Sequence, residues 1–217
     1  MKHAPKPPRS FWFAKLVRAT VGRALAALFR TRVLGIEHVP GSGVILAGNH
    51  ISYADPVLLW CKSPRPTHFM AKSELWDSAL MAWGLDRFWA FPVRRGAADR
   101  EALLRASALL KAGEPVGIFP EGTRNFDGSA EAQQGAAFLA IRNGVPVVPV
   151  GIAGTDEISP PGSRMIHFPK VTMSFGERID PAGFTQEKRG ERVQAMTAEI
   201  MDRIAGELEA AKRGKRA

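Results

Sequence analysis

Two short polar segments, each following an apolar run, carry residue types suited to acid–base and anion-binding chemistry. The first is Gly48-Asn49-His50-Ile51-Ser52-Tyr53-Ala54-Asp55-Pro56, in which a carboxylate lies five residues after a histidine. A histidine that follows a strand can act as a general base, because its unperturbed pKa is about 6.5. Asp55 could hydrogen-bond the other ring nitrogen, fix the tautomer and stabilise the imidazolium. The spacing also fits a purely structural arrangement, in which Asp55 caps the next helix and His50 is a satisfied loop residue.

The second segment is Phe119-Pro120-Glu121-Gly122-Thr123-Arg124-Asn125. Its glycine lets backbone N–H groups approach a ligand closely, and its arginine offers a planar fork suited to phosphate. A surface turn with an incidental Glu–Arg pair would have the same sequence. Two arginines also follow an apolar run in Phe91-Pro92-Val93-Arg94-Arg95-Gly96, where two solvated charges are the simpler interpretation. No nucleophilic serine is obviously paired with His50, which favours activation of a hydroxyl on the substrate itself.

Strand and helix patterns alternate around these segments. Near-continuous apolar runs predict strands that are covered on both faces, and they are separated by helical patterns. This alternation predicts an α/β domain with a mostly parallel or mixed central sheet flanked by helices. The expected strands are Gly43–Gly48, Thr67–Ala71, Phe88–Val93, Pro115–Phe119, Val145–Ile152 and Val171–Phe175; the expected helices are Asp55–Lys62, Ser73–Trp83, Ala97–Lys111, Gly135–Arg142 and Thr185–Arg213.

The formal net charge of +9 is concentrated at the N-terminus. Eight basic residues and no acidic residue precede Glu37, whereas residues 37–185 have a net charge of −1. A helix is predicted after Ser10. Its apolar side carries Phe13, Leu16, Val17, Val21, Ala24, Leu25 and Leu28, and its opposite side carries Lys15, Arg18, Gly22, Arg23 and Arg30. A basic amphipathic helix of this kind suits the surface of an anionic bilayer, although its apolar side could instead pack on the domain core.

Several functional classes are disfavoured by the sequence. Charge is not spread over a folded face with interleaved aromatics, as it usually is in nucleic-acid-binding domains. One cysteine, Cys61, excludes an intramolecular disulfide and a cysteine-rich zinc site, and the histidines have no metal-ligand spacing. We find no phosphate-binding or dinucleotide-binding glycine loop, no GxSxG elbow, no convincing secretory signal and no apolar run long enough for a membrane span.

Together, the polar segments resemble the glycerolipid acyltransferase family, and most closely the bacterial 1-acyl-glycerol-3-phosphate acyltransferases. NHxxxxD, FPVxRG, FPEGTR and VPVVPV occur in the family's order, and the resemblance runs from about Gly35 to Asp180. It implies acyl transfer from a thioester, acyl-CoA or acyl carrier protein, to the free hydroxyl of a lysophospholipid. The expected product is phosphatidic acid, and neither a metal nor another cofactor is implied.

The resemblance also implies roles for individual residues. His50 would be the general base, Asp55 would orient and polarise it, and Arg95 and Arg124 would bind the acceptor phosphate. Further acceptor contacts would come from Lys72, Glu121, Gly122 and Thr123. A solvated lysine near a helix start is an equally good interpretation of Lys72.

Departures from the family pattern at three places bear on the acceptor headgroup. Arg94 stands where an acid is common, Asn125 where serine is common, and Gln133-Gln134 where a lysine is often close. A lyso-ornithine-lipid acceptor is therefore an alternative, although it has no phosphate for the arginines to bind. A non-catalytic lipid-binding protein and a thioesterase are further alternatives.

We expect three segments: a basic membrane-docking segment (1–31), a catalytic domain (32–184), and a C-terminal helix with a basic tail (185–217). The expected partners are the lysophospholipid, the acyl thioester, an anionic membrane surface and, as one possible donor, acyl carrier protein. The expected location is peripheral, on the cytoplasmic face of the cell membrane.

Overall fold

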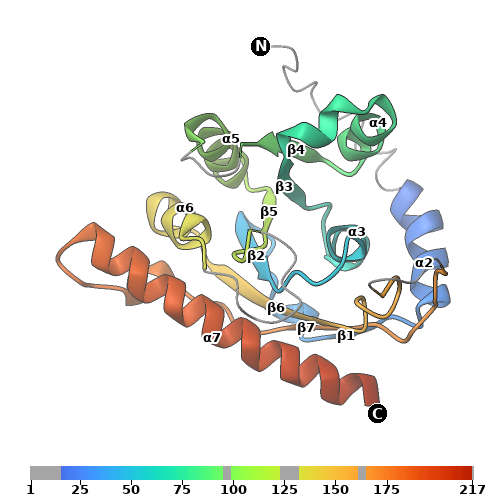
Figure 1. Ribbon diagram of the computed structural model, residues 1–217. Coiled ribbons are helices and arrows are strands. Elements are labelled where there is room, and N and C mark those ends of the chain that lie inside the picture. The colour runs from blue at the N-terminus through green and yellow to red at the C-terminus, as the bar shows by residue number, and fades with distance from the viewer. Residues whose placement is uncertain (1–15, 95–98, 123–131, 161–164, 217) are drawn as a thin grey trace.

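A seven-stranded sheet lies between two layers of helices in the computed structural model, which describes residues 16–94, 99–122, 132–160 and 165–216 (Figure 1). The strand order is β1-β7-β6-β2-β5-β3-β4. The α/β fold predicted from the alternating patterns is confirmed. The strands are β1 (Arg32–Leu34), β2 (Val44–Gly48), β3 (His68–Lys72), β4 (Ala90–Val93), β5 (Pro115–Ile118), β6 (Val147–Ala153) and β7 (Thr172–Phe175).

The sheet is mixed, and its one antiparallel pair is β6–β7. Strands β6, β2, β5, β3 and β4 are parallel, so that their carboxyl ends meet at one edge of the sheet. β2 lies between β5 and β6, which brings together the loops that follow these three strands. Ligands of open α/β sheets gather at such an edge.

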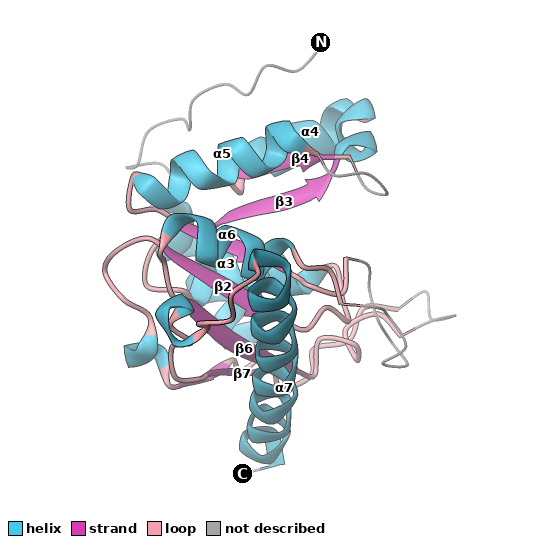
Figure 2. Cartoon of the chain, turned by 90° about the vertical axis from the view of Figure 1, so that its left-hand side faces the viewer, coloured by secondary structure: helices cyan, strands magenta, loops and turns pink. Residues whose placement is uncertain are grey.

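Helices cover both faces of the sheet because successive strand residues point to opposite sides. In β2, Ile45 and Ala47 belong to a core cluster with α5, α6 and α7, whereas Val44 and Leu46 belong to a second cluster with α3. Figure 2 looks onto the first layer, with α5, α6 and α7 on the near side of the sheet. The main helices are α3 (Ala54–Lys62), α4 (Ala79–Arg87), α5 (Arg100–Lys111), α6 (Gly135–Asn143) and α7 (Arg189–Arg216).

Most predicted elements lie within a few residues of their observed positions. The segment predicted as one helix over Ser73–Trp83 is a short 3-10 helix, η3 (Ser73–Asp77), followed by α4. Strand β1 was not predicted, because three residues at a sheet edge give too short a pattern. Two further 3-10 turns, η2 (Ile36–His38) and η4 (Pro181–Gly183), lie in the connections.

The described part of the N-terminal segment is helical, and its predicted sides are partly wrong. Val17 and Leu25 pack on the core and Arg23 and Arg30 are exposed, as predicted, whereas Leu16, Val21 and Leu28 are exposed and Arg18 and Gly22 turn inward. It contains a π-helical stretch, η1 (Arg18–Gly22), followed by α2 (Arg23–Leu28). Gly22 is buried against Cys61, and the Arg18 guanidinium lies 5.6 Å from the Trp60 ring. A π-helical stretch changes the residue period, so residues assigned to the outer side at a regular 3.6-residue period turn toward α3.

Helix α7 packs closely along β6 and β7, and Gly151 permits this approach (Figure 2). A Cβ atom at Gly151 would lie 2.1 Å from the Glu207 carbonyl carbon, which is backbone and cannot rotate away. The close packing of α7 on the sheet therefore requires a glycine in the middle of β6.

We expect Gly151→Ala to lower the free energy of unfolding by about 2 kcal/mol or more, because α7 must move away from β6. Urea-induced unfolding followed by circular dichroism measures this change. Gly206→Ala is the matched control, since a Cβ there meets no atom within 4 Å and should stabilise α7 by ~0.5–1 kcal/mol. Equal stability of the two variants would contradict the close packing.

Candidate active site

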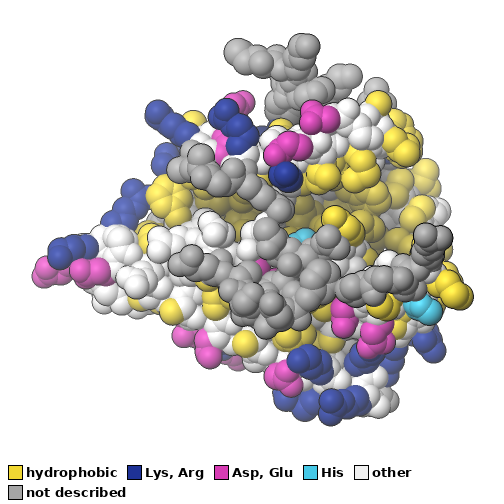
Figure 3. All heavy atoms as spheres, in the orientation of Figure 1, with side chains coloured by type: hydrophobic (Ala, Val, Ile, Leu, Met, Phe, Trp, Pro, Cys, Tyr) yellow, Lys and Arg dark blue, Asp and Glu magenta, His cyan; other side chains and the backbone are white. Residues whose placement is uncertain are grey.

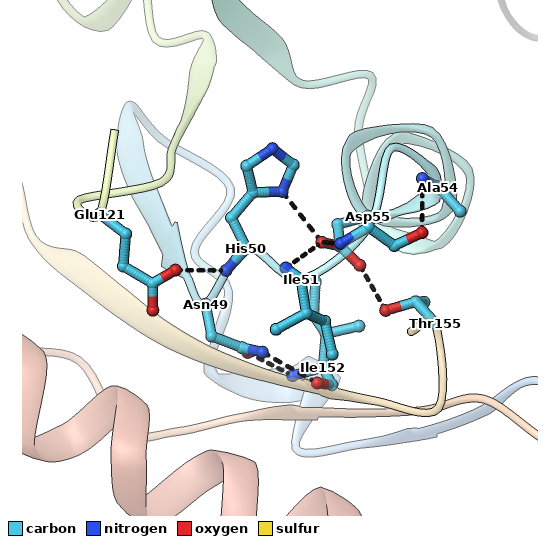
Figure 4. A network of polar contacts seen from close by, with 9 residues as sticks. Asn49, His50, Ile51, Ala54, Asp55, Glu121, Ile152 and Thr155 are labelled. Atoms are coloured by element: carbon cyan, nitrogen blue, oxygen red, sulfur yellow. Dashed lines mark hydrogen bonds and ion pairs between the residues drawn. The ribbon is translucent and has the colours of Figure 1, made fainter. Parts of the chain in front are cut away.

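The loop after β2 holds a histidine and a carboxylate in direct contact (Figure 4). His50 Nδ1 lies 2.9 Å from Asp55 Oδ2. The Asp55 side chain is fully buried, and the His50 side chain is 12% exposed. Because a carboxylate can only accept, His50 Nδ1 carries the hydrogen and Nε2 keeps a lone pair. In Figure 4 this second ring nitrogen points away from Asp55.

The Asp55 carboxylate hydrogen-bonds the loop that precedes it and does not cap helix α3. Its Oδ2 atom accepts the backbone N–H groups of Ile51 at 2.8 Å and Ser52 at 2.7 Å. Helix α3 has Tyr53 at its N-cap position, with no hydrogen bond from the cap side chain. Of the two arrangements that the spacing allows, the structure therefore has the one in which the carboxylate orients the imidazole.

Asn49 fixes the start of the loop to the neighbouring strand β6. Its side-chain amide donates to the carbonyl oxygen of Ile152 at 3.0 Å, and its amide oxygen accepts the Ile152 N–H at 2.7 Å. Asn49 is 3% exposed, so these bonds form away from water, where an unpaired amide would be costly. The pair extends the contact between β2 and β6 by one residue and sets the direction in which His50 leaves the sheet.

Aromatic rings support the imidazole from one side. The Phe119 ring stacks on His50 with a centroid distance of 4.5 Å and an interplanar angle of 23°. Phe69 stacks on Phe119 in turn, at 5.9 Å. Gly117 makes room for this arrangement, since a Cβ there would lie 2.2 Å from Phe69 Cε1.

The turn after β5 brings Glu121 to the same loop. Glu121 Oε2 accepts the backbone N–H of His50 at 3.0 Å (Figure 4). Gly122 adopts a left-handed conformation with φ of +67°, and its N–H donates to the carbonyl of Phe119. Glycine takes this conformation without strain, which allows the tight turn. At least one oxygen of Glu121 therefore holds the His50 loop.

The basic residues predicted to bind an anion lie near the same edge or outside the described residues. Lys72 ends β3, with its side chain 47% exposed, and forms an ion pair with Glu74 at 3.1 Å. Arg94 ends the described part of the β4 loop; its backbone N–H donates to Asp99 Oδ2 at 2.8 Å, and its guanidinium lies 3.5 Å from the same oxygen. Arg95, Thr123 and Arg124 lie outside the described residues.

The contacts of Arg94 also change the expected charge of this region. The hydrogen bond from the Arg94 backbone, with smaller contributions from Ala102 and the Arg94 guanidinium, lowers the pKa of Asp99. Asp99 thus remains a carboxylate beside the extra arginine, and it also caps α5. The additional positive charge expected from Arg94 is partly balanced by this acid five residues later.

A second histidine, at the start of β3 beside the edge strand β4, has a different environment. His68 in β3 is 5% exposed and contacts Trp89. Burial, together with the positive charge of Arg105, lowers the pKa of His68 to about 4. His68 is therefore neutral at physiological pH and is part of the core.

The surface around the described site is hollowed and apolar. In Figure 3, hydrophobic side chains line a depression beneath α4 on the face turned toward the viewer. Helix α4 carries three exposed apolar residues: Leu80 is 78%, Met81 46% and Trp83 58% exposed. Exposed apolar surface of this kind is typical of interaction or ligand-binding sites.

Sequence reasoning missed three residues that hold the histidine and its carboxylate in place. The sequence indicates Asn49 only as part of a motif and Phe119 only as the end of a strand, and no pattern indicates Thr155. Phe119 directly precedes the Pro-Glu-Gly turn. Because His50 also follows a strand, the two strand ends could have been expected to lie side by side. Thr155 lies 100 residues from Asp55, and only the pairing of β2 with β6 brings the two together.

The sequence matches a known protein family over the region that builds this site. The family model described as "Acyltransferase" matches residues 30–153, which is more than half of the chain. The chain belongs to the acyltransferase family. The matched region extends from β1 to the end of β6 and includes His50, Asp55 and Glu121.

Individual relatives agree with this assignment. A 1-acyl-sn-glycerol-3-phosphate acyltransferase of Bacillus subtilis is 32% identical over 175 residues, covering 80% of this chain and 85% of the relative. The chloroplastic 1-acyl-sn-glycerol-3-phosphate acyltransferase BAT2 of Brassica napus is 32% identical over 143 residues, covering 64% of this chain and 41% of that protein.

A solved structure supports the fold over nearly the whole chain. The crystal structure of the 1-acyl-sn-glycerophosphate (LPA) acyltransferase PlsC from Thermotoga maritima superposes with a TM-score of 0.66 at 26% identity. The superposition covers 93% of this chain and 81% of the PlsC chain. Among the described residues, no helix combines the length and apolarity that a membrane crossing requires.

Proposed function

We propose that this acyltransferase moves a fatty acyl group from a thioester to the free hydroxyl of 1-acyl-glycerol-3-phosphate, giving phosphatidic acid. The observation that carries the proposal is the His50–Asp55 pair, in which Nδ1 is bound to a buried carboxylate and Nε2 points away from it (Figure 4). The names of the relatives from Bacillus subtilis and Thermotoga maritima, a 1-acyl-sn-glycerol-3-phosphate acyltransferase and a 1-acyl-sn-glycerophosphate (LPA) acyltransferase, support this choice of substrate.

His50 is the general base in the proposed reaction. Nε2 takes the proton of the acceptor hydroxyl as its oxygen attacks the thioester carbonyl carbon. The C–S bond then breaks, the new ester forms, and the proton carried by His50 leaves with the thiol. General base catalysis of this kind contributes roughly 10²–10⁴-fold to a rate, and positioning of the two bound reactants contributes the larger part.

Asp55 stabilises the imidazolium that forms during the transfer. Its carboxylate is held by two backbone N–H groups and faces Nδ1, so it cannot turn away as the charge on His50 changes. A buried, fixed charge acts more strongly than one in water, because the surrounding dielectric constant is low. No covalent intermediate on the enzyme is needed, and the donor, acyl-CoA or acyl carrier protein, supplies the activated acyl group.

The acceptor-binding roles rest on the resemblance in sequence and, for Lys72 and Gly122, on their positions at the end of β3 and after β5. We assign Arg95 and Arg124 to the acceptor phosphate, with Lys72, Gly122 and Thr123 nearby. We assign Glu121 two roles. One carboxylate oxygen holds the His50 loop by accepting its backbone N–H, and the carboxylate also lies beside the bound acceptor in the proposed complex.

We expect His50→Ala to lower the turnover of lysophosphatidic acid with an acyl thioester by roughly 10²–10⁴-fold, since the general base is lost. Mass spectrometry of phosphatidic acid and free thiol measures the product and its stoichiometry. His167→Ala is the control, because His167 is an exposed histidine of the same chain. Near-full activity of His50→Ala would overturn the mechanism.

The same assay separates the alternative activities. A thioesterase would release free thiol and fatty acid without phosphatidic acid. An ornithine-lipid enzyme would acylate lyso-ornithine lipid in preference to lysophosphatidic acid. A non-catalytic lipid-binding protein would give no product from either acceptor.

Arg124→Ala should raise the KM for lysophosphatidic acid by roughly 10–100-fold, because a charge-assisted bond to the acceptor phosphate is lost. Initial rates at varied acceptor concentration measure this change. Arg142→Ala on α6 is the matched control, since it removes an exposed arginine to which no acceptor contact is assigned. An unchanged KM in Arg124→Ala would contradict the phosphate assignment.

We also propose that η1 and α2 dock the enzyme on an anionic membrane, at the cytoplasmic face where acyl thioesters are made. The outward side of this helix carries Leu16, Val21 and Leu28, which are 61%, 46% and 46% exposed. The basic residues Arg23 and Arg30 are exposed close to them. Exposed apolar side chains with nearby cations suit insertion at the headgroup boundary.

The double variant Val21→Ser/Leu28→Ser should bind anionic vesicles roughly tenfold or more weakly, because two apolar side chains no longer leave water. Cosedimentation with phosphatidylglycerol-containing vesicles measures binding. Leu104→Ser is the matched control: Leu104 is 48% exposed on α5, on the opposite side of the molecule from α2 (Figure 1). Unchanged binding of the double variant, or an equal loss in Leu104→Ser, would contradict docking through this helix.

A further inference from the structure

A buried threonine that follows β6 contacts the carboxylate of the His50–Asp55 pair, whereas His50 and Asp55 themselves follow β2. Thr155 follows the end of β6 and is completely buried. Its hydroxyl donates to Asp55 Oδ1 at 2.5 Å (Figure 4). The residue lies two positions beyond the region that matches the acyltransferase family, which ends at residue 153.

The two oxygens of Asp55 have different partners. Oδ2 receives the His50 Nδ1–H and the N–H groups of Ile51 and Ser52, all of them from the β2–α3 loop itself. Oδ1 receives the hydroxyl of Thr155, which follows the neighbouring strand β6. Contacts within one loop can move with that loop, whereas the bond from Thr155 fixes the carboxylate relative to the sheet.

The end of β6 is shaped to present this hydroxyl. Gly154 has a φ of +93°, and a Cβ atom there would lie 2.4 Å from the carbonyl oxygen of Lys170. This backbone conformation favours glycine and turns the chain toward α3 after β6 ends. The same strand end binds Asn49 through Ile152, so β6 holds the His50 loop at its first residue and again at Asp55.

We propose that Thr155 is a positioning residue for acyl transfer. It fixes the rotation of the Asp55 carboxylate, and through Asp55 it sets the direction of His50 Nε2 toward the acceptor hydroxyl. The inference rests on the proposed function of the His50–Asp55 pair and adds a third residue to it. Small errors in the placement of a catalytic group are costly, so the effect belongs to turnover and not to acceptor binding.

The test compares kcat and KM of purified full-length variants with lysophosphatidic acid and an acyl-CoA. Thr155→Val keeps the shape and removes the hydroxyl, and it should lower kcat by roughly 10–100-fold with the acceptor KM changed by less than about twofold. Thr155→Ser keeps the hydroxyl and should restore kcat to within about threefold of the wild type.

Thr67→Val provides the matched control. Thr67 is also fully buried and also loses a hydroxyl hydrogen bond on substitution, to Ser63 at 2.9 Å, but it lies before β3 and away from His50. Its melting temperature should fall while kcat per folded enzyme stays at the wild-type value. An equal loss of kcat in Thr67→Val and Thr155→Val would show that the effect is general destabilisation, and would overturn the proposal.

A double-mutant cycle tests whether Thr155 acts through Asp55. In an Asp55→Ala background, measured in single-turnover reactions, Thr155→Val should change the remaining rate by less than about twofold. The same fold-loss in both backgrounds, or unchanged kcat in Thr155→Val, overturns the proposal. If Thr155→Val does not fold, Thr155→Ala decides by the same criteria. An inactive wild-type enzyme would instead contradict the proposed function.

Discussion

A single buried carboxylate organises the candidate site. Asp55 is fully enclosed, and burying an ion without partners would cost several kcal/mol or more, so the surrounding chain must supply donors. It does so with two backbone N–H groups, a hydroxyl and an imidazole N–H. The β2–α3 loop is consequently wound around Asp55, and the orientation of His50 follows from that winding.

The strand order decides which residues can meet at this carboxylate. β2 is the only strand among the described residues that has β5 on one side and β6 on the other. The β5 loop therefore reaches the His50 backbone through Glu121, and the end of β6 reaches Asp55 through Thr155. Parallel strands place these three loops at one edge without any long excursion of the chain.

Much of this arrangement follows from local sequence patterns, and the remainder depends on tertiary contacts. The apolar runs predict six of the seven strands, and the order of polar motifs identifies His50, Asp55 and Glu121 as a group. The outward side of the N-terminal helix could not be predicted, because the π-helical stretch at Arg18–Gly22 breaks the regular period. The contact of Thr155 could not be predicted for a different reason. Its partner Asp55 is 100 residues away in the sequence, and no local motif indicates a hydrogen bond between residues that follow different strands.

The site is divided between separate parts of the sheet, and this has a consequence for how such enzymes can diversify. His50, Asp55 and their supports come from the ends of β2 and β6, with Phe119 and Glu121 of the β5 turn against them, whereas Arg95, which is proposed for the headgroup, follows β4. In the proposed assignment, a substitution of Arg95 changes a headgroup contact and none of the described contacts of His50 and Asp55. The proposed function thus leaves headgroup choice and proton transfer open to separate selection.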